Sequence, residues 1–397
     1  MAQYNYTVID KGGKKKRGTL DAQNEEIARE ILQGRGMYII EIGSESMSFG
    51  GKKCRTKLRD ISLFSRQVST MLSSGVNILV AIEAMEDATE DKNFKKALKD
   101  VQKKVQTGTS VSQAMRDNST AFPDLLCTMI ASGEITGDLD KAFDRMALYY
   151  DKQYKMNQKI VNATIYPSIL VCVSVLAIAA LMIFAIPQFL QVFEEMNIEL
   201  PAITKFVLAV GSGMKTYWYL LVALVVAIIF GYKAYYASSE GGIAIDGMKL
   251  KIPVIGQILI YAALARFSRT LSALIEAGVS MLPAIEITKS VVLNKSMVKN
   301  MEGMTASIKA GESLSTNLES IEIIPKIFTV MVKTGEESGQ IDYMLQKAAD
   351  LYENEVDVKV SRINTIIEPV IIVFLALVLG VIMASVMLPM FTLYGSM

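Results

Sequence analysis

Two glycine–lysine strings, GGKKKR at residues 12–17 and GGKKCR at 50–55, come closest in this sequence to a phosphate-binding loop. Both lack the upstream glycine and the hydroxyl residue that such a loop needs to hold phosphate and magnesium. The chain contains no histidine, which removes the commonest general base and a usual zinc ligand. Its three cysteines, Cys54, Cys127 and Cys172, form no C-x-x-C pair. The sequence therefore predicts no catalytic residue, no metal site, no bound cofactor and no enzymatic activity.

The carboxylates with the most distinctive setting lie in two related strings, GEITGDLD at 133–140 and GEESGQID at 335–342. Glu134 and Glu336 could be docking points, or members of a polar network that joins each soluble domain to the helix that follows it. Alternatively, the flanking glycines end and restart helices, and each glutamate lies in a first turn, where the helix dipole favours a negative charge. The sequence leaves both interpretations open. The four glycines concerned are Gly133, Gly137, Gly335 and Gly339.

A second group of acids follows helical spacing and would form one acidic face. Such a face is most often simply solvated, but it could also contact a partner. The chain continues with six lysines between residues 92 and 104. The four acids are Glu83, Glu86, Asp87 and Glu90.

Other charged and rigid residues have both a structural and a functional interpretation. Arg66 and Arg269 occupy apolar helical stretches and could make contacts within a domain or toward a partner protein. The basic tip from Lys14 to Arg17 could contact anionic lipid or an acidic protein, although positive tips are common simply for solubility. Four prolines are compatible with helix starts and kinks, or with a groove for other helices. They are Pro167, Pro187, Pro369 and Pro389.

Three apolar segments could cross a membrane. Half of the residues are hydrophobic (51%) but a fifth are charged (20%), which indicates soluble parts joined to a few concentrated spans. Residues 164–190 and 367–391 contain no charged residue except Glu368 and reach the ~20 residues that a bilayer requires. Residues 217–237 are bracketed by tryptophan and tyrosine, which favour membrane interfaces. The N-terminus has no signal-peptide pattern.

The distribution of lysine and arginine predicts the orientation. There are 25 of these residues in 1–163 and 13 in 238–365, but only Lys205 and Lys215 in 191–216. The two large segments are therefore expected in the cytoplasm, and the short loop and the C-terminal tail outside.

An internal repeat supports the same orientation. Residues 64–83, FSRQVSTMLSSGVNILVAIE, align without gaps with 267–286, FSRTLSALIEAGVSMLPAIE, and ten of the twenty positions are identical. The offset of 203 residues falls to 202 by the GE-x-x-G strings. Each copy comprises a soluble helical domain and the span after it, so 217–237 returns the chain between the copies. The acidic face is replaced in the second copy by TKSVVLNKS, which predicts different partners for the two domains.

Local signals predict several helix ends. Gly75 and Gly278 stand where a left-handed residue would end a helix, and Ser110 and Ser313 are expected N-caps. Residues 1–43 alternate as strand, strand, helix and strand.

The chain resembles the PilC/GspF family, the inner-membrane platform proteins of type IV pili and type II secretion systems. The resemblance rests on the N-terminal module, both GE-x-x-G-x-[LI]-D strings, the proline-bounded spans and details such as KIPVIGQ and YENEV, which favour the pilus branch. It implies a protein that couples a hexameric cytoplasmic ATPase to the movement of pilins into or out of the fibre. Other inner-membrane assembly proteins, lipid and further copies of the chain are the implied partners, and nucleic acid is not.

The predicted fold is mainly α: a polytopic membrane protein with two homologous cytoplasmic helical bundles, three transmembrane helices and a small α+β N-terminal module. A type II secretion platform remains the main alternative, and a small transporter is a weaker one. The expected boundaries are 1–43 for the module, 44–57 for a linker, 58–163 and 238–366 for the bundles, 164–190, 217–237 and 367–391 for the spans, 191–216 for an external loop and 392–397 for the tail.

Overall fold

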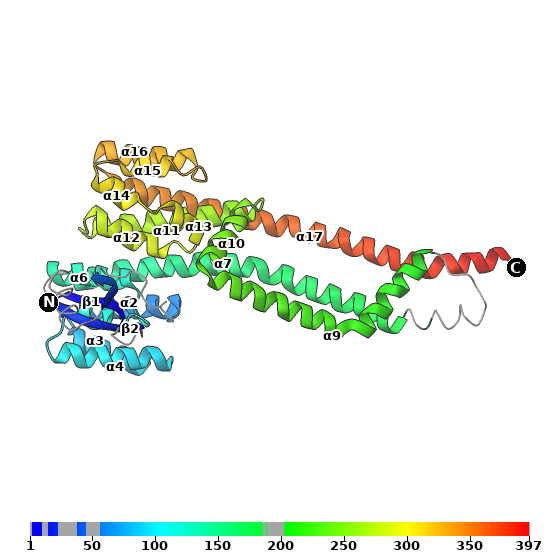
Figure 1. Ribbon diagram of the computed structural model, residues 1–397, viewed down its shortest axis with the longest axis horizontal. Helices are drawn as coiled ribbons and strands as arrows, with labels where there is room; N and C mark the ends of the chain where they lie inside the picture. Colours follow the sequence, from blue (N-terminus) through cyan, green and yellow to red (C-terminus); the bar gives the residue numbers. More distant parts are fainter. Residues whose placement is uncertain are drawn as a thin grey trace.

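The computed structural model describes residues 2–9, 15–22, 38–44, 56–185, 188 and 202–396. Within them the chain is mainly helical, as expected. Two helical bundles lie at one end of an elongated molecule, and long helices extend from them toward the other end, where the C-terminus lies (Figure 1).

Three N-terminal strands pair as an antiparallel sheet in the order β2-β1-β3. They are β1 (Ala2–Ile9), β2 (Lys15–Ala22) and β3 (Tyr38–Ser44). The helix expected between β2 and β3, most of the predicted tether and Lys14 of the basic tip lie outside the described residues.

The two bundles contain corresponding helices in the same order. The first consists of α2 (Leu58–Ser73), α3 (Ile78–Ala88), α4 (Lys92–Gln106), α5 (Val111–Arg116), α6 (Asp124–Thr136) and the start of α7 (Leu139–Ala180). The second consists of α11 (Ile255–Glu276), α12 (Met281–Val291), α13 (Lys295–Asn300), α14 (Met304–Lys309), α15 (Leu314–Glu319), α16 (Lys326–Ser338) and the start of α17 (Ile341–Ser396). The repeat in the sequence is thus a repeat in structure.

The predicted helix ends are confirmed in both copies. Gly75 and Gly278 follow α2 and α11 with φ of 83° and 80°, a conformation that costs glycine little. Ser110 and Ser313 cap α5 and α15, because their side chains accept hydrogen bonds from the N–H groups of Gln113 and Thr316.

The bundles differ in how their cores are filled. In the first, the ring of Phe64 packs against those of Phe94, Phe122 and Phe143, with centroids 5.6 to 5.9 Å apart. In the second, Met297 takes the place of Phe94, and the single helix α4 is replaced by α13 and α14 with Gly303 between them at φ 87°. The lysine-rich face of the first bundle therefore has no continuous helical counterpart in the second.

Among the described residues, three helical stretches are long and apolar enough to cross a membrane: Leu139–Phe184, Ile255–Glu276 and Ile341–Leu388. The first and last contain most of the expected spans 164–190 and 367–391, and only 11% of the most apolar part of each is buried. The middle one is α11, and 72% of its most apolar part is buried. As the counterpart of α2, α11 is a core helix of the second bundle, and its apolar composition reflects packing against protein.

The expected second span belongs to α9 (Ala202–Ala237), which begins earlier than the sequence predicts. Residues 202–216, expected in an external loop, form the first part of this helix, which bends at Tyr217 (φ −110°, ψ 16°). Tertiary contacts hold this part in place: Thr204 Oγ1 donates to the carbonyl of Ser385 at 2.7 Å, and Val207 packs with Met182 and Ile382. Beyond α9, α10 (Ser239–Lys251) leads into the second bundle.

Pro167 and Pro369 do not begin helices, contrary to one interpretation of the sequence. Both lie inside α7 and α17, which continue from the bundles into the apolar segments without a break. A proline removes one hydrogen bond, but the turns on either side can hold the helix together. Pro187 lies outside the described residues, and Pro389 lies in the last part of α17.

Candidate functional site

The GE-x-x-G strings form the turn at which each bundle joins its long helix, and we call this turn the elbow. In the first elbow, α6 ends at Gly137, which is left-handed with φ 78°, and α7 begins two residues later. Gly133, one turn before, is buried against the start of α7. A Cβ at this position would lie 2.6 Å from the Cβ of Ala142, so only glycine allows the two helices to approach this closely.

The second elbow repeats this geometry between α16 and α17. Gly339 ends α16 in the left-handed region with φ 68°. A Cβ on Gly335 would lie 2.9 Å from the backbone Cα of Ile341 and 2.9 Å from Cβ of Met344. The glycine pair in each string thus does two jobs: the first allows close packing and the second allows the chain to turn.

The glutamate of each elbow caps the N-terminus of a helix other than its own. Glu134 accepts hydrogen bonds from the N–H groups of Val111 (2.5 Å) and Ser112 (3.2 Å) at the start of α5, and from the Ser112 hydroxyl. Glu336 accepts from the N–H groups of Leu314 (2.6 Å) and Ser315 (3.0 Å) at the start of α15. The interpretation that each glutamate lies in a first turn is wrong, because both lie in the last turn of α6 or α16. The N-terminus that they stabilise belongs to another helix.

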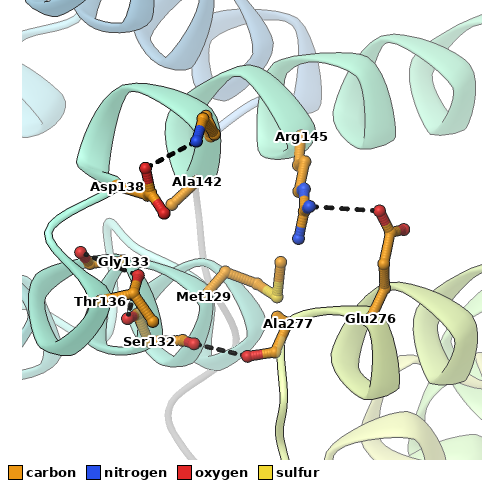
Figure 2. A pocket seen from close by; sticks show the side chains of 10 residues that line it. Met129, Ser132, Gly133, Thr136, Asp138, Ala142, Arg145, Glu276 and Ala277 are labelled. Carbon is orange, nitrogen blue, oxygen red and sulfur yellow. Dashed lines mark hydrogen bonds and ion pairs between the residues drawn. The ribbon is translucent and has the colours of Figure 1, made fainter.

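The first elbow lies against the end of α11 in the other bundle (Figure 2). The Ser132 hydroxyl donates to the carbonyl of Ala277 at 2.6 Å, and Arg145 pairs with Glu276 at 3.2 Å. Between these contacts lies a cleft of about 180 Å³ that is lined by both bundles. The end of α11 therefore packs directly onto the turn that sets the direction of α7.

The contact between the bundles continues along α7. The Tyr149 hydroxyl bonds the buried Thr270 hydroxyl at 2.8 Å, and burial raises the pKa of Tyr149. Arg266 reaches across to Gln153 (3.2 Å) and Asn157 (2.6 Å).

Ion pairs join the two long helices farther along. Lys152 lies 3.3 Å from Asp350, and Lys159 lies 2.5 Å from Asp357. These pairs hold α7 beside α17 at the point where both leave the bundles.

The two repeated arginines have different roles. Arg66 makes one exposed contact, 3.6 Å from Asp144. Arg269 is 8% exposed and binds Asp350 (2.5 Å) and Glu353 (2.9 and 3.1 Å). Burial would raise the pKa of Asp350, but the hydrogen bond and charge of Arg269 outweigh it and lower that pKa. Both arginines thus make contacts within their own domain, which is one of the two uses that the sequence suggests. These contacts do not test the second use, a contact with a partner protein.

The predicted acidic face is only partly free. Glu86 and Asp87 on α3 lie 4.0 Å and 3.8 Å from Lys99 and Lys95 of α4. Glu83 and Glu90 are exposed, and Glu90 lies beyond the end of α3. The face and the lysines thus partly neutralise each other.

A polar cluster at the end of α9 was not predicted. Asp246 of α10 is 3% exposed and accepts hydrogen bonds from the N–H of Lys295 (2.9 Å), from Lys249 (2.9 Å) and from the Tyr236 hydroxyl (3.2 Å). Burial would raise the pKa of Asp246, but these donors lower it. A lone acid in the apolar run IAIDGM was the available signal. The cluster ties the end of α9 to α10 and α13.

Within the described part of the chain, no group of three or more histidine, cysteine, aspartate or glutamate side chains could hold a metal ion. The polar residues described above are engaged in joining helices, and none is arranged as a nucleophile with a base.

A family model matches this chain twice, once in each copy of the repeat. The family model for type II secretion system protein F matches residues 64–187 and again 267–389, and the model for the N-terminal domain of that protein matches residues 1–43. The two windows begin 203 residues apart and end 202 apart, as the repeat does.

Full-length relatives come from both kinds of machine. The type IV pilus assembly protein PilC of Thermus thermophilus is 33% identical, with 100% of this chain and 99% of that protein covered. The type IV pilus assembly protein TapC of Aeromonas hydrophila is 32% identical over 98% of this chain and 95% of that protein. The type II secretion system protein F of Xanthomonas campestris pv. campestris is 30% identical over 99% of each.

The capping role of the elbow glutamate predicts a local loss of stability. Glu336→Ala leaves the N–H groups of Leu314 and Ser315 without their acceptor, which we expect to lower the free energy of opening of α15 by about 1–3 kcal/mol. Hydrogen exchange at these two amides in the full chain measures it. The control is Glu337→Ala. The Glu337 side chain is 69% exposed and pairs with Lys333 at 3.9 Å, and such an exposed ion pair contributes little to stability. We therefore expect its loss to change the free energy of opening by no more than about 0.5 kcal/mol. Unchanged exchange in Glu336→Ala would contradict the capping role.

Proposed function

The chain belongs to the type II secretion system protein F family, and on that premise we propose that it is the inner-membrane platform of a type IV pilus assembly machine. The observation that carries the proposal is the full-length match to relatives named as pilus assembly proteins, at 33% and 32% identity. The two matched ranges, 64–187 and 267–389, cover most of each bundle and of the long helix that leaves it. The similarity therefore extends over both copies of the repeat.

The apolar helices support the membrane location. Large apolar side chains of α7, α9 and α17 are exposed over the lengths that would lie in lipid, for example Leu176, Phe230 and Phe374 at 64%, 70% and 62%. Such a surface needs an apolar covering. We propose that the bundles and the N-terminal module, residues 1–43, lie in the cytoplasm and that the C-terminus lies outside.

The continuity of α7 and α17 suggests how the platform works. The 42 residues of α7 and the 56 of α17 correspond to about 63 and 84 Å of helix. A continuous helix transmits a push or a rotation better than a flexible loop does. We propose that a hexameric ATPase acts on the bundles, that the elbows fix the direction of the long helices, and that these helices act on pilins in the membrane.

The type II secretion alternative is separated from the pilus by the phenotype of a deletion. Cells that lack this chain are expected to lose surface fibres, measured as pilin in the sheared fraction, and to keep exporting folded proteins. Complementation with the intact gene is the control. Lost export with normal fibres would assign the chain to a secretion system.

Membrane topology can be tested with reporter fusions. Fusions after Asn162 and Ser361 are expected to report cytoplasm, because each follows a segment rich in lysine and arginine. A fusion after Glu199 is expected to report the opposite side. An external signal from the Ser361 fusion would exclude the arrangement with three spans.

If α17 transmits motion as a continuous rigid helix, the stiffness of its part after the bundle should matter more than the sequence of that part. Seven glycine and serine residues inserted after Arg362, which is exposed, should abolish fibre assembly because they break the rigid connection. Seven alanines at the same place keep the helix and turn its faces by only about 20°, so assembly should persist at least in part. Both proteins must be present at normal levels in the membrane. Normal fibre assembly with the flexible insert would exclude transmission of motion through a rigid α17.

A further inference from the structure

Two lysines converge on one tyrosine ring at the end of α9, where α10 leads into the second bundle (Figure 1). The ammonium of Lys249, on α10, lies 4.8 Å from the centre of the Tyr236 ring, and that of Lys295, at the start of α13, lies 4.7 Å from it. Lys295 Nζ also donates to the Tyr236 carbonyl at 3.1 Å. Cation–π attraction and these hydrogen bonds hold the two ammonium groups close to each other, although they come from different helices.

The charges of this cluster do not cancel. Asp246 supplies one negative charge and pairs with Lys249 at 2.9 Å. Among the described residues, the Lys295 ammonium forms no ion pair, and its one hydrogen bond goes to a backbone carbonyl. An ammonium has three N–H donors, so both lysines keep donors free for a further acceptor. The Lys249 side chain is 36% exposed and can reach such a group. An excess positive charge with spare donors suits a phosphate oxygen.

The cluster lies where an apolar segment ends. Tyr236 belongs to the last turn of α9, and the expected span 217–237 ends one residue later. One to two turns before it, Ile228 and Phe230 are 60% and 70% exposed. Tyrosine at the end of such an exposed apolar surface is typical of the boundary between lipid and water.

The turn between α10 and α11 lies at a similar depth. α11 runs antiparallel to α7, because Glu276 pairs with Arg145 at one end and Arg266 bonds Asn157 farther along. From Arg266 back to Ile255, the first residue of α11, is about 16 Å of helix. The same distance along α7 leads from Asn157 into the expected span 164–190. The start of α11 is therefore level with the start of that span.

This turn presents apolar side chains outward. The N–H of Ile255 donates to the carbonyl of Pro253 at 2.9 Å, across Val254. The φ of 68° and ψ of −55° at Val254 are those of a γ-turn of the rare, strained kind. Ile252, Val254 and Ile255 are 43%, 38% and 48% exposed. At this depth such side chains are stabilised by lipid and not by water.

We propose that Lys249 and Lys295 bind the phosphate of an anionic phospholipid in the membrane leaflet that faces the bundles. The headgroup oxygens accept hydrogen bonds from the two ammonium groups, and the acyl chains lie against the exposed apolar side chains of α9. The turn 252–255 enters the same leaflet and holds α10 at the surface. A soluble phosphate compound matches the lysines alone, whereas a lipid also matches the apolar surroundings. The proposal rests on the membrane location proposed above and not on the pilus.

Quenching of tryptophan fluorescence by brominated lipid tests the site in the full chain. Trp218 is the only tryptophan, and it is replaced by phenylalanine. Tyr235, which is 55% exposed and adjacent to Tyr236, is replaced by tryptophan as the probe. The protein is reconstituted into vesicles of equal parts phosphatidylcholine and phosphatidylglycerol, with bromine on the acyl chains of one lipid or of the other. Comparison of the two quenching signals measures the preference of the site for the anionic lipid.

We expect the brominated anionic lipid to quench the probe more strongly, with each lysine contributing about fivefold to the preference. Lys249→Gln and Lys295→Gln should each lower the preference by about this factor, whereas Lys249→Arg, which keeps the charge, should retain it. Lys299→Gln is the matched control, because Lys299 is exposed one turn beyond Lys295 on α13. Thermal unfolding checks that each variant is folded. Lys295→Gln leaves the pair between Asp246 and Lys249 intact, so it tests the site even if Lys249→Gln does not fold.

Different outcomes overturn different parts of the proposal. Equal quenching by the two brominated lipids, or an unchanged preference in Lys295→Gln, would exclude the headgroup site and leave the membrane location intact. Loss of the preference in excess inorganic phosphate, but not in sodium chloride of the same ionic strength, would assign the lysines to a soluble anion. Absence of quenching by either lipid would contradict the membrane location itself, and with it the proposed function.

Discussion

The architecture depends on one steric constraint, the close approach of α6 to α7 and of α16 to α17 at the elbows. Gly133 and Gly335 leave no room for even a methyl group at this point. With the helices so close, the carboxylate of the next residue reaches the start of α5 or α15, and the second glycine returns the chain along the bundle. The direction of each long helix relative to its bundle is therefore fixed by backbone contact, which is stiffer than contact between long side chains.

Features that depend on local sequence or on composition were predictable. Glycine and serine ends of helices, the apolar lengths and the repeat follow from residues that are close in sequence or identical between copies. The role of Glu134 did not follow, because its partners Val111 and Ser112 lie more than twenty residues away. Nor did the early start of α9, whose first turns are held by Ser385 and Ile382 of a distant helix. Proline suggested boundaries at 167 and 369, but packing and the flanking turns kept both helices continuous.

Identical residues in the two copies have diverged in role because their surroundings are not equivalent. Arg269 lies beside α7 of the other bundle through the shared acid Asp350, whereas Arg66 faces solvent. The sequence shows only that both positions hold arginine. Which one becomes buried is decided by the order in which the bundles stack, and the alignment of the copies carries no information about that order.

The helix α9 lies outside the repeat, and it runs opposite to α7 and α17 (Figure 1). Duplication of one bundle with one outgoing helix would by itself have left the second bundle at the far end of the molecule, inverted relative to the first. Placing both bundles at one end requires an odd number of returning helices between the copies. Without α9, the two halves would lie on opposite sides of any membrane that the chain crossed, so this one unrepeated helix is what allows the two bundles to meet.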